Sequence, residues 1–412
     1  MHRLGQALLL LLLLLVGGCG GERTGAGSWQ AERDTVGGTI VVRTVSGSGW
    51  GAPRTLVERA TVGKADGEEY DLLGDFRAIA VAPDGSIYVS DAGPVLRKYA
   101  PDGRYVATFG RKGGGPGEYA QPDGGLAVLS DGRVLIRDPG NGRITVYDSS
   151  GAYLTYWRIR AGSYFSRQFA VDTGDNVYAP MTADPDSAPD KRRAGLARFQ
   201  ADGSPRDTLL VPQWDVTPAL VTGSDNKGSS MTYSVPFAPG TAWALSPLGY
   251  FVGGVEDSYR ITLFRPGSPL VLGREVAAVS VAADEAADSK QAIVDRMRSA
   301  FGSWNWDGPD VPDTKPPFTD VLVGNRGRIW VRLSREGRRE ANIDPSKPDT
   351  WTEPVVYDVF EPDGRYLGQV TTPDGFLAYP QPVFRGDTVW GGFEDADGVR
   401  YVKRFELKAE GS

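Results

Sequence analysis

The sequence predicts an all-β fold: a six-bladed β-propeller of four-stranded blades, closed by an N-terminal strand and carrying one helical insertion. The 412 residues include 54 Gly, 29 Pro and 10 Trp, a composition typical of short strands joined by tight turns. Runs of β-branched and aromatic residues flank a glycine-containing turn at six places. Only one clear segment repeats its apolar residues with helical spacing.

The repeating unit is a hairpin of two short strands, and several of the hairpins are followed by a further strand pair. The turn glycines recur at intervals of 47, 42, 75, 78 and 59 residues. The short intervals match a four-stranded blade of ~40 to 50 residues, and the long ones require insertions. The six hairpins read AIAVAPDGSIYVSD (78–91), LAVLSDGRVLIRD (126–138), FAVDTGDNVYA (169–179), ALSPLGYFVG (244–253), VLVGNRGRIWV (321–331) and PVFRGDTVWG (382–391).

The last repeat has only three strands of its own after Pro382. A strand from the other end of the chain would complete it and remove an exposed sheet edge. The run TIVVRTV at 39–45 is the candidate, so we expect it to pair with the strand around 401–407. The propeller then covers residues 36–408.

Residues 284–301 form the expected helix. Acidic residues lead the segment and arginines end it, which complements the helix dipole. Ile293, Met297, Ala300 and Phe301 fall on one face and predict the side that packs.

The helix belongs to an insertion of about residues 281–318, whose second part is rich in Pro, Asp and Trp. Trp304 and Trp306 have two interpretations. They could stack on a sugar or a peptide, or they could pack the helix against the ring. As ligand contacts, they would be the apolar anchors of a binding surface formed by one face of the ring and the insertion.

The chain begins with a basic residue pair, an unbroken run of leucines at 8–15, and Val-Gly-Gly-Cys at 16–19. This pattern predicts a secretory signal at 1–18, because the apolar run is too short to span a bilayer. It resembles the signal of bacterial lipoproteins, in which a cysteine such as Cys19 is lipidated and becomes the first mature residue. Residues 19–35 are then a flexible tether to a membrane outside the cytoplasm, at a periplasmic or outer-membrane face.

Removing the signal restricts the chemistry available to the mature chain. The only histidine is His2 and the only cysteine is Cys19. A Ser-His-Asp triad, a Cys-His pair, a histidine zinc site and an internal disulfide are therefore all excluded. We assign no catalytic residue, no metal ligand and no cofactor.

The net charge of −7 and the pI of about 5.1 argue against nucleic acid as a partner. We expect a monomer.

A repeat family becomes recognisable within residues 109–151. This stretch contains a glycine-rich link, Gly-Glu-aromatic, Gly-Leu-Ala-Val, Asp-Gly and Asn-x-Arg-Ile in order. It resembles the NHL repeat, and the whole chain resembles bacterial 6-bladed β-propeller lipoproteins, which implies a fold and a location more than an activity. The signature positions are Gly117, Glu118, Tyr119, Pro122, Asp131, Gly132, Asp138, Asn141, Arg143, Tyr147 and Gly151.

Fold analogy places ligands over the central channel of a propeller, where the loops linking the blades converge. Side chains that follow the second strand of a blade, or that lie in the links, are the ones expected to reach this face. Mixed arginines and carboxylates there would suit a polar ligand such as a carbohydrate or a peptide terminus. The candidate ligand-binding residues are Arg77, Asp91, Arg137, Asp138, Glu256 and Arg332, together with Trp304 and Trp306 on the insertion.

Two functions are consistent with these observations. The first is a membrane-anchored, non-catalytic propeller that binds a protein, peptide or glycan. The alternative is a metal-dependent lactonase or lyase that uses carboxylate ligands at the channel. We favour binding, because the mature chain lacks histidine and a free thiol and no lactonase motif can be matched in it.

Cys19→Ala should release the protein from membranes or block removal of its leader, because the thioether to lipid cannot form. Cell fractionation followed by immunoblotting measures this, with Gly21→Ala as a control that keeps the cysteine. A Cys19→Ala protein that is processed and still sediments with membranes would contradict the anchor.

Overall fold

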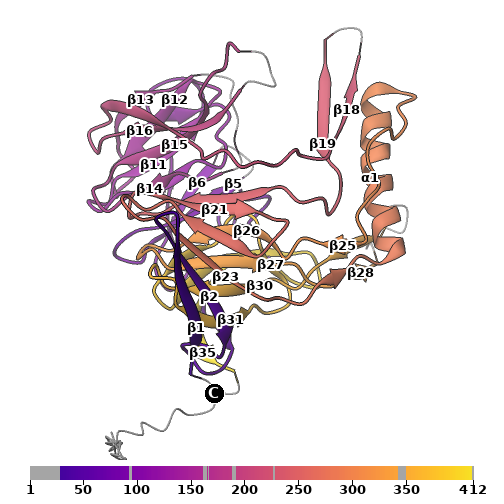
Figure 1. Ribbon diagram of the computed structural model, residues 1–412. Helices are drawn as coiled ribbons and strands as arrows, with labels where there is room; N and C mark the ends of the chain where they lie inside the picture. The colour runs from indigo at the N-terminus through magenta and orange to yellow at the C-terminus, as the bar shows by residue number, and fades with distance from the viewer. Residues whose placement is uncertain are drawn as a thin grey trace, which may run out of the picture.

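The protein is described by a computed structural model in which antiparallel β-sheets make up the body and one helix stands beside it (Figure 1). The predicted signal, Cys19 and the first part of the tether lie outside the described residues. None of the helical structure in the described ranges is long and apolar enough to cross a membrane. The described ranges are 28–91, 95–160, 165, 167–187, 192–225, 228–341 and 349–410.

The first three predicted repeats form four-stranded antiparallel sheets with their strands in chain order. Gly85 and Gly132 turn the first two hairpins at φ values of 86° and 88°, which strain any residue with a Cβ atom. In the third hairpin the left-handed residue is Asp175, one position after the predicted Gly174. The strands are β4 (Ala78–Val81), β5 (Ile87–Asp91), β6 (Val95–Tyr99), β7 (Tyr105–Phe109), β10 (Leu126–Val128), β11 (Val134–Asp138), β12 (Arg143–Tyr147), β13 (Tyr153–Arg158), β14 (Ala170–Val171), β15 (Val177–Thr182), β16 (Ala194–Phe199) and β17 (Pro205–Leu210).

The fourth and fifth repeats also have four antiparallel strands each. A further hairpin extends the fourth sheet, because its second strand pairs in parallel with the outer strand of that sheet. The strands of the fourth sheet are β20 (Thr241–Leu245), β21 (Phe251–Val255), β22 (Arg260–Leu263) and β23 (Leu270–Arg274), with β1 (Gln30–Val36) and β2 (Thr39–Ser46) outside them; those of the fifth are β26 (Phe318–Val323), β27 (Ile329–Leu333), β30 (Val356–Phe360) and β31 (Tyr366–Thr371).

The two ends of the chain meet in the last sheet, but through a different segment from the one predicted. The expected strand, 39–45, lies in β2 and pairs with β23, so its pairing with 401–407 was wrong. The next strand along, β3, pairs antiparallel with the last strand from Arg54↔Ala409 to Val62↔Val402. The strands concerned are β3 (Arg54–Val62), β33 (Val383–Arg385), β34 (Thr388–Glu394) and β35 (Arg400–Ala409), with the short β32 (Phe376–Leu377) beside β34.

The reason for the difference is side-chain burial. Leu56 and Val62 on β3 are 6% and 0% exposed, and they enter the clusters beneath β31 and β35. On β2, only Val42 and Thr44 are buried, and Val42 packs with the fourth and fifth sheets. Both segments have the residue pattern of a strand, so the sequence alone does not indicate which of them pairs with β35.

Six apolar clusters fill the spaces between successive sheets. One of them joins the last sheet to the first, since Trp390 and Val402 pack with Ile79 and Val89. The others link the first sheet to the second, the second to the third, and so on along the chain. The core is therefore divided into layers between sheets.

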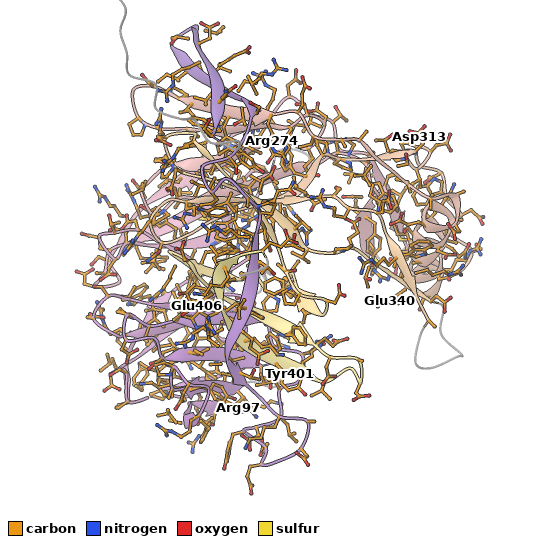
Figure 2. All side chains as sticks on the ribbon, turned by 90° about the horizontal axis from the view of Figure 1, so that it is seen from below. Arg97, Arg274, Asp313, Glu340, Tyr401 and Glu406 are labelled. Atoms are coloured by element: carbon orange, nitrogen blue, oxygen red, sulfur yellow. The ribbon has the colours of Figure 1, made fainter. Side chains whose placement is uncertain are left out.

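The insertion forms a lobe to one side of the body. Figure 1 shows the helix upright beside the β18–β19 hairpin, and Figure 2 shows Asp313 and Glu340 on this lobe, apart from Arg97 and Tyr401 on the body. The lobe is larger than the predicted 281–318, because it also takes strands from two other inserted segments. Its elements are β18 (Leu220–Ser224), β19 (Ser230–Ser234), β24 (Val279–Ser280), α1 (Ala283–Phe301), β25 (Thr314–Lys315), β28 (Arg338–Glu340) and β29 (Thr350–Thr352).

The predicted helix is confirmed, and α1 begins one residue earlier than expected. Ile293 and Met297 are buried as predicted, whereas Ala300 is exposed and Val294 is buried instead. A buried ion pair also holds the helix: Lys315 Nζ lies 2.5 Å from Glu285 Oε1, and both side chains are at most 3% exposed.

Shortening the chain from its N-terminus tests the role of β3. A protein that begins at Pro53 loses β1, β2 and the segment 47–52 but keeps β3, so it should still melt in one cooperative transition. A protein that begins at Lys64 should lose cooperativity, because β31 and β35 both lose a partner strand. Circular dichroism and calorimetry measure the transitions, and equal cooperativity in both shortened chains would contradict this role.

Candidate functional site

Six strands from along the whole chain meet around one cavity of about 230 Å³. Its wall is formed by residues of β4, β10, β14, β20, β26 and β33, together with the residues next to them. Most of the wall is apolar, with Arg167, Gln168, Asn325, Gln381 and Arg385 as its polar exceptions. Because the strands come from the whole length of the chain, the cavity lies where the sheets converge.

Three charged side chains gather near Arg167, where β14 and β26 begin and β21 and β27 end. We call Arg167, Glu256, Asp320 and Arg332 the channel-mouth cluster. Asp320 and Arg332 face each other directly across β26 and β27, which places their Cβ atoms roughly 5 Å apart. Glu256 and Arg167 lie close enough for their charges to act on Asp320.

Local contacts hold each member of the channel-mouth cluster. Arg167 donates from Nη1 to the carbonyl of Trp243 at 2.7 Å, and its guanidinium lies 4.1 Å from the centre of that indole ring. Glu256 accepts the Gly240 amide at 2.8 Å. Arg332 donates from Nε to Thr319 Oγ1 at 2.8 Å. Neither guanidinium has another protein acceptor within the described ranges, so the remaining N–H groups can bind water or a ligand.

Burial changes the acid–base behaviour of the two carboxylates. It raises the pKa of Asp320, although Arg332 and Arg167 oppose the shift. It also raises the pKa of Glu256, where the Gly240 hydrogen bond opposes the shift and Asp320 adds to it. Raised pKa values of this kind concentrate at binding and catalytic sites. The cluster can therefore offer both hydrogen-bond donors and acceptors to one ligand.

Glu256 and Arg332 were predicted from the sequence, and the structure brings them together. Arg167 and Asp320 were missed. Arg167 lies in the link that enters β14, and its place in a blade link was a signal for it in the sequence. Asp320 lies within the strand FTDVLV, whose first and fourth residues are buried. A carboxylate in a largely apolar strand was a usable sequence signal for a binding residue.

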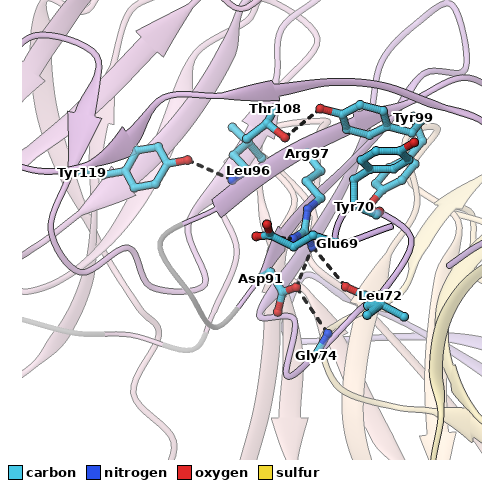
Figure 3. A network of polar contacts seen from close by, with 11 residues as sticks. Glu69, Tyr70, Leu72, Gly74, Asp91, Leu96, Arg97, Tyr99, Thr108 and Tyr119 are labelled. Carbon is cyan, nitrogen blue, oxygen red and sulfur yellow. Dashed lines mark hydrogen bonds and ion pairs between the residues drawn. The ribbon is translucent and has the colours of Figure 1, made fainter. Parts of the chain in front are cut away.

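Asp91 lies in a network within the first sheet (Figure 3). Its carboxylate accepts from Arg97 Nη1 at 2.9 Å and from the Gly74 amide at 3.3 Å. Arg97 also donates to the carbonyl of Leu72 and lies 3.8 Å from Glu69. Asp91 thus ties the segment before β4 to the sheet.

Arg137 and Asp138 are also used within the fold. Arg137 pairs with Asp123, both side chains being at most 7% exposed, and lies under the ring of Phe165. Asp138 is fully buried and accepts hydrogen bonds from the Ala120 and Gln121 amides and from Asn141 Nδ2. These contacts fasten the blade link to β11.

The other three predicted residues lie apart from the cluster. Arg77 is exposed and donates to the carbonyl of Pro122 at 2.8 Å. Trp304 and Trp306 are half-buried in the lobe, where they join the apolar cluster of Val221 and Met297. Their indole N–H groups donate to carbonyls of the lobe, so the contacts agree with the packing interpretation.

The described residues contain no group of three His, Cys, Asp or Glu side chains that could hold a metal ion.

No protein-family model matches this chain, and no curated protein matches its sequence. It resembles the solved structure of a duf4221 family member from Bacteroides vulgatus, at 8% identity and a TM-score of 0.47, covering 87% of this chain and 99% of that chain. It also resembles a Bacteroides fragilis protein described as exported (10% identity, TM-score 0.46, 86% and 94% covered). A third similar structure is that of a gluconolactonase from Xanthomonas campestris, a propeller enzyme. Its identity is 15% and its TM-score 0.40, covering 86% of this chain and 95% of that chain. Similarities this low assign no activity to this chain.

Asp320→Asn should raise the melting temperature at pH 8 and have little effect at pH 3.5. A carboxyl group with a raised pKa in the folded state binds its proton more tightly there. Its contribution to stability is therefore largest below the pKa of the unfolded chain and falls as pH rises through the folded pKa.

Thermal melts of wild type and Asp320→Asn from pH 3.5 to 8 measure this effect. Asp257→Asn, an exposed carboxylate near the same site, is the control. A variant that is less stable than wild type at pH 8 would show that pairing with the arginines outweighs burial.

Proposed function

We propose that this protein is a lipid-anchored, extracytoplasmic β-propeller of six blades that binds a polar ligand at its channel mouth and catalyses no reaction. The six blades would be the sheets that begin with β4, β10, β14, β20, β26 and β33. The shared cavity supports this arrangement, and so does the apolar cluster between the last and first sheets. The anchor rests on the Val-Gly-Gly-Cys signal at 16–19.

The channel-mouth cluster is the observation that carries the binding role. Arg167 and Arg332 present N–H donors, and Asp320 and Glu256 present acceptors. The end of a peptide matches this set of donors and acceptors best, because it has a carboxylate or an ammonium group beside backbone amides. Arginine is well suited to the carboxylate, since its planar fork can make two parallel hydrogen bonds. A protein partner would present the same groups, and a glycan would use only the hydrogen bonds.

The alternative function is a metal-dependent lactonase or lyase with carboxylate ligands at the channel. Asp320 and Glu256 are the carboxylates it would use, and their raised pKa values are the observation in its favour. The mixture of two arginines with two carboxylates favours the binding role, because the cations oppose the approach of a metal ion.

Binding of short peptides tests the proposal directly. Titration calorimetry on residues 20–412 would compare a tripeptide library with free ends, the same library with capped ends, and a panel of oligosaccharides. We expect binding of free-ended peptides, weakened at least 10-fold by Arg332→Gln and by Arg167→Gln. Arg104→Gln, at an exposed arginine just before β7, should leave it unchanged.

Equal binding by all three variants would place the ligand elsewhere and overturn the channel-mouth proposal. Binding of the oligosaccharides alone would replace the peptide with a glycan. Stoichiometric Ca²⁺ in the purified protein, together with lactone opening that Asp320→Asn abolishes, would establish the enzyme.

A further inference from the structure

A second cavity, lined by arginines, lies between the second and third sheets. It has a volume of about 590 Å³ and shares no lining residue with the channel cavity. Arg158 comes from the end of β13, Arg160 from just after it, and Arg192 from just before β16. Arg137 also lines it, at the end of β11. The volume falls within the range of roughly 300 to 1,000 Å³ that is usual for small-molecule sites.

Few carboxylates of the protein lie near the arginines of this cavity to neutralise their positive charge. No Asp or Glu among the described residues lines it. Arg160 lies 3.4 Å from Asp186, but the two side chains are 62% and 90% exposed, and such pairs are weak. The guanidinium of Arg137 is held by Asp123.

Arg158 and Arg192 have no carboxylate partner in the part of the chain that the structure describes. Arg192 donates from Nε to the carbonyl of Ser187 at 3.2 Å, and the guanidinium of Arg158 lies 5.9 Å from the ring centre of Tyr156. Three arginines whose charges repel one another are an unexpected group in a chain of net charge −7. An anion bound among them would remove that repulsion.

Apart from Thr182, the rest of the cavity wall is apolar. Ile159, Met181 and Phe199 line it, and the ring of Phe199 stacks on Trp157 with centroids 5.6 Å apart. Trp157 is only 5% exposed, so this pair gives the wall a fixed surface. An inorganic anion would fill little of such a cavity and would leave the apolar wall in contact with water.

We infer that this cavity binds an organic anion, in which an oxyanion head group pairs with Arg158, Arg160 and Arg192 and an apolar body covers Met181 and Phe199. Guanidinium groups pair with carboxylate, phosphate and sulfate oxygens through two hydrogen bonds at once. The site does not depend on ligand binding at the channel mouth. Its affinity falls with ionic strength, because exposed charges make the contact.

Titration calorimetry on residues 20–412 with octyl phosphate, octanoate and octyl sulfate, each below its micelle concentration, tests the inference. We expect one molecule per chain for at least one of the three. Arg158→Ala with Arg192→Ala should weaken binding at least 10-fold, and Arg158→Lys should weaken it less, because it retains the charge. Arg206→Ala, an exposed arginine on β17 outside the cavity, is the matched control and should change affinity less than 2-fold.

Two further probes separate the parts of the proposed ligand. Inorganic phosphate and neutral octyl glucoside should each bind at least 10-fold more weakly than octyl phosphate. Phosphate that binds as tightly as octyl phosphate would overturn the role of the apolar wall. Octyl glucoside binding as tightly, equal affinity in the double variant and wild type, or no binding of any octyl anion would overturn the site. A thermal melt of each variant confirms folding, and if the double variant melts early, Arg192→Ala alone replaces it.

Discussion

Pairing between β3 and β35 is the interaction on which the rest of the structure depends. β3 lies between β31 and β35, and it covers the edge of β35 and part of the edge of β31. Its side chains Leu56 and Val62 enter two of the apolar clusters between sheets. A set of antiparallel sheets without this pairing would expose two unpaired edges, each a template for association with another chain. The pairing also brings the two ends of the described chain together.

The convergence of the strands at the cavity explains why charged side chains are partly buried at the channel mouth. Each first strand brings its neighbouring residues into a narrow space, and Asp320 and Glu256 lose much of their hydration there. Arg167 is held against Trp243 in the same space. The fold thus concentrates charge where solvent is restricted, and groups of both signs remain available to a ligand. The arginine cavity lies elsewhere, lined by β11 and β13 of the second sheet and by β15 and β16 of the third.

The sequence predicted the all-β character, the hairpins at Gly85 and Gly132, and the single helix. These depend on local patterns: glycine at positive φ, alternation of apolar residues, and spacing along one helix face. It failed to select β3 over β2 as the partner of β35, because two similar strands follow one another and only tertiary burial distinguishes them. At the candidate site, Glu256 and Arg332 were predicted by position in the repeat. Asp91, Arg137 and Asp138 follow the same rule, but each also binds a residue of a blade link, and the sequence does not specify the course of these links.

Native-state hydrogen exchange measured by mass spectrometry tests the central claim most directly. If β3 is an integral strand between β31 and β35, the amides of 54–62 should exchange only through global unfolding, as slowly as those of β5 and β11. Exchange across 30–46 should be faster, because β1 lies at the open edge of its sheet. Rapid exchange of 54–62 through local opening, while β5 and β11 stay protected, would contradict the claim that this pairing holds the fold together.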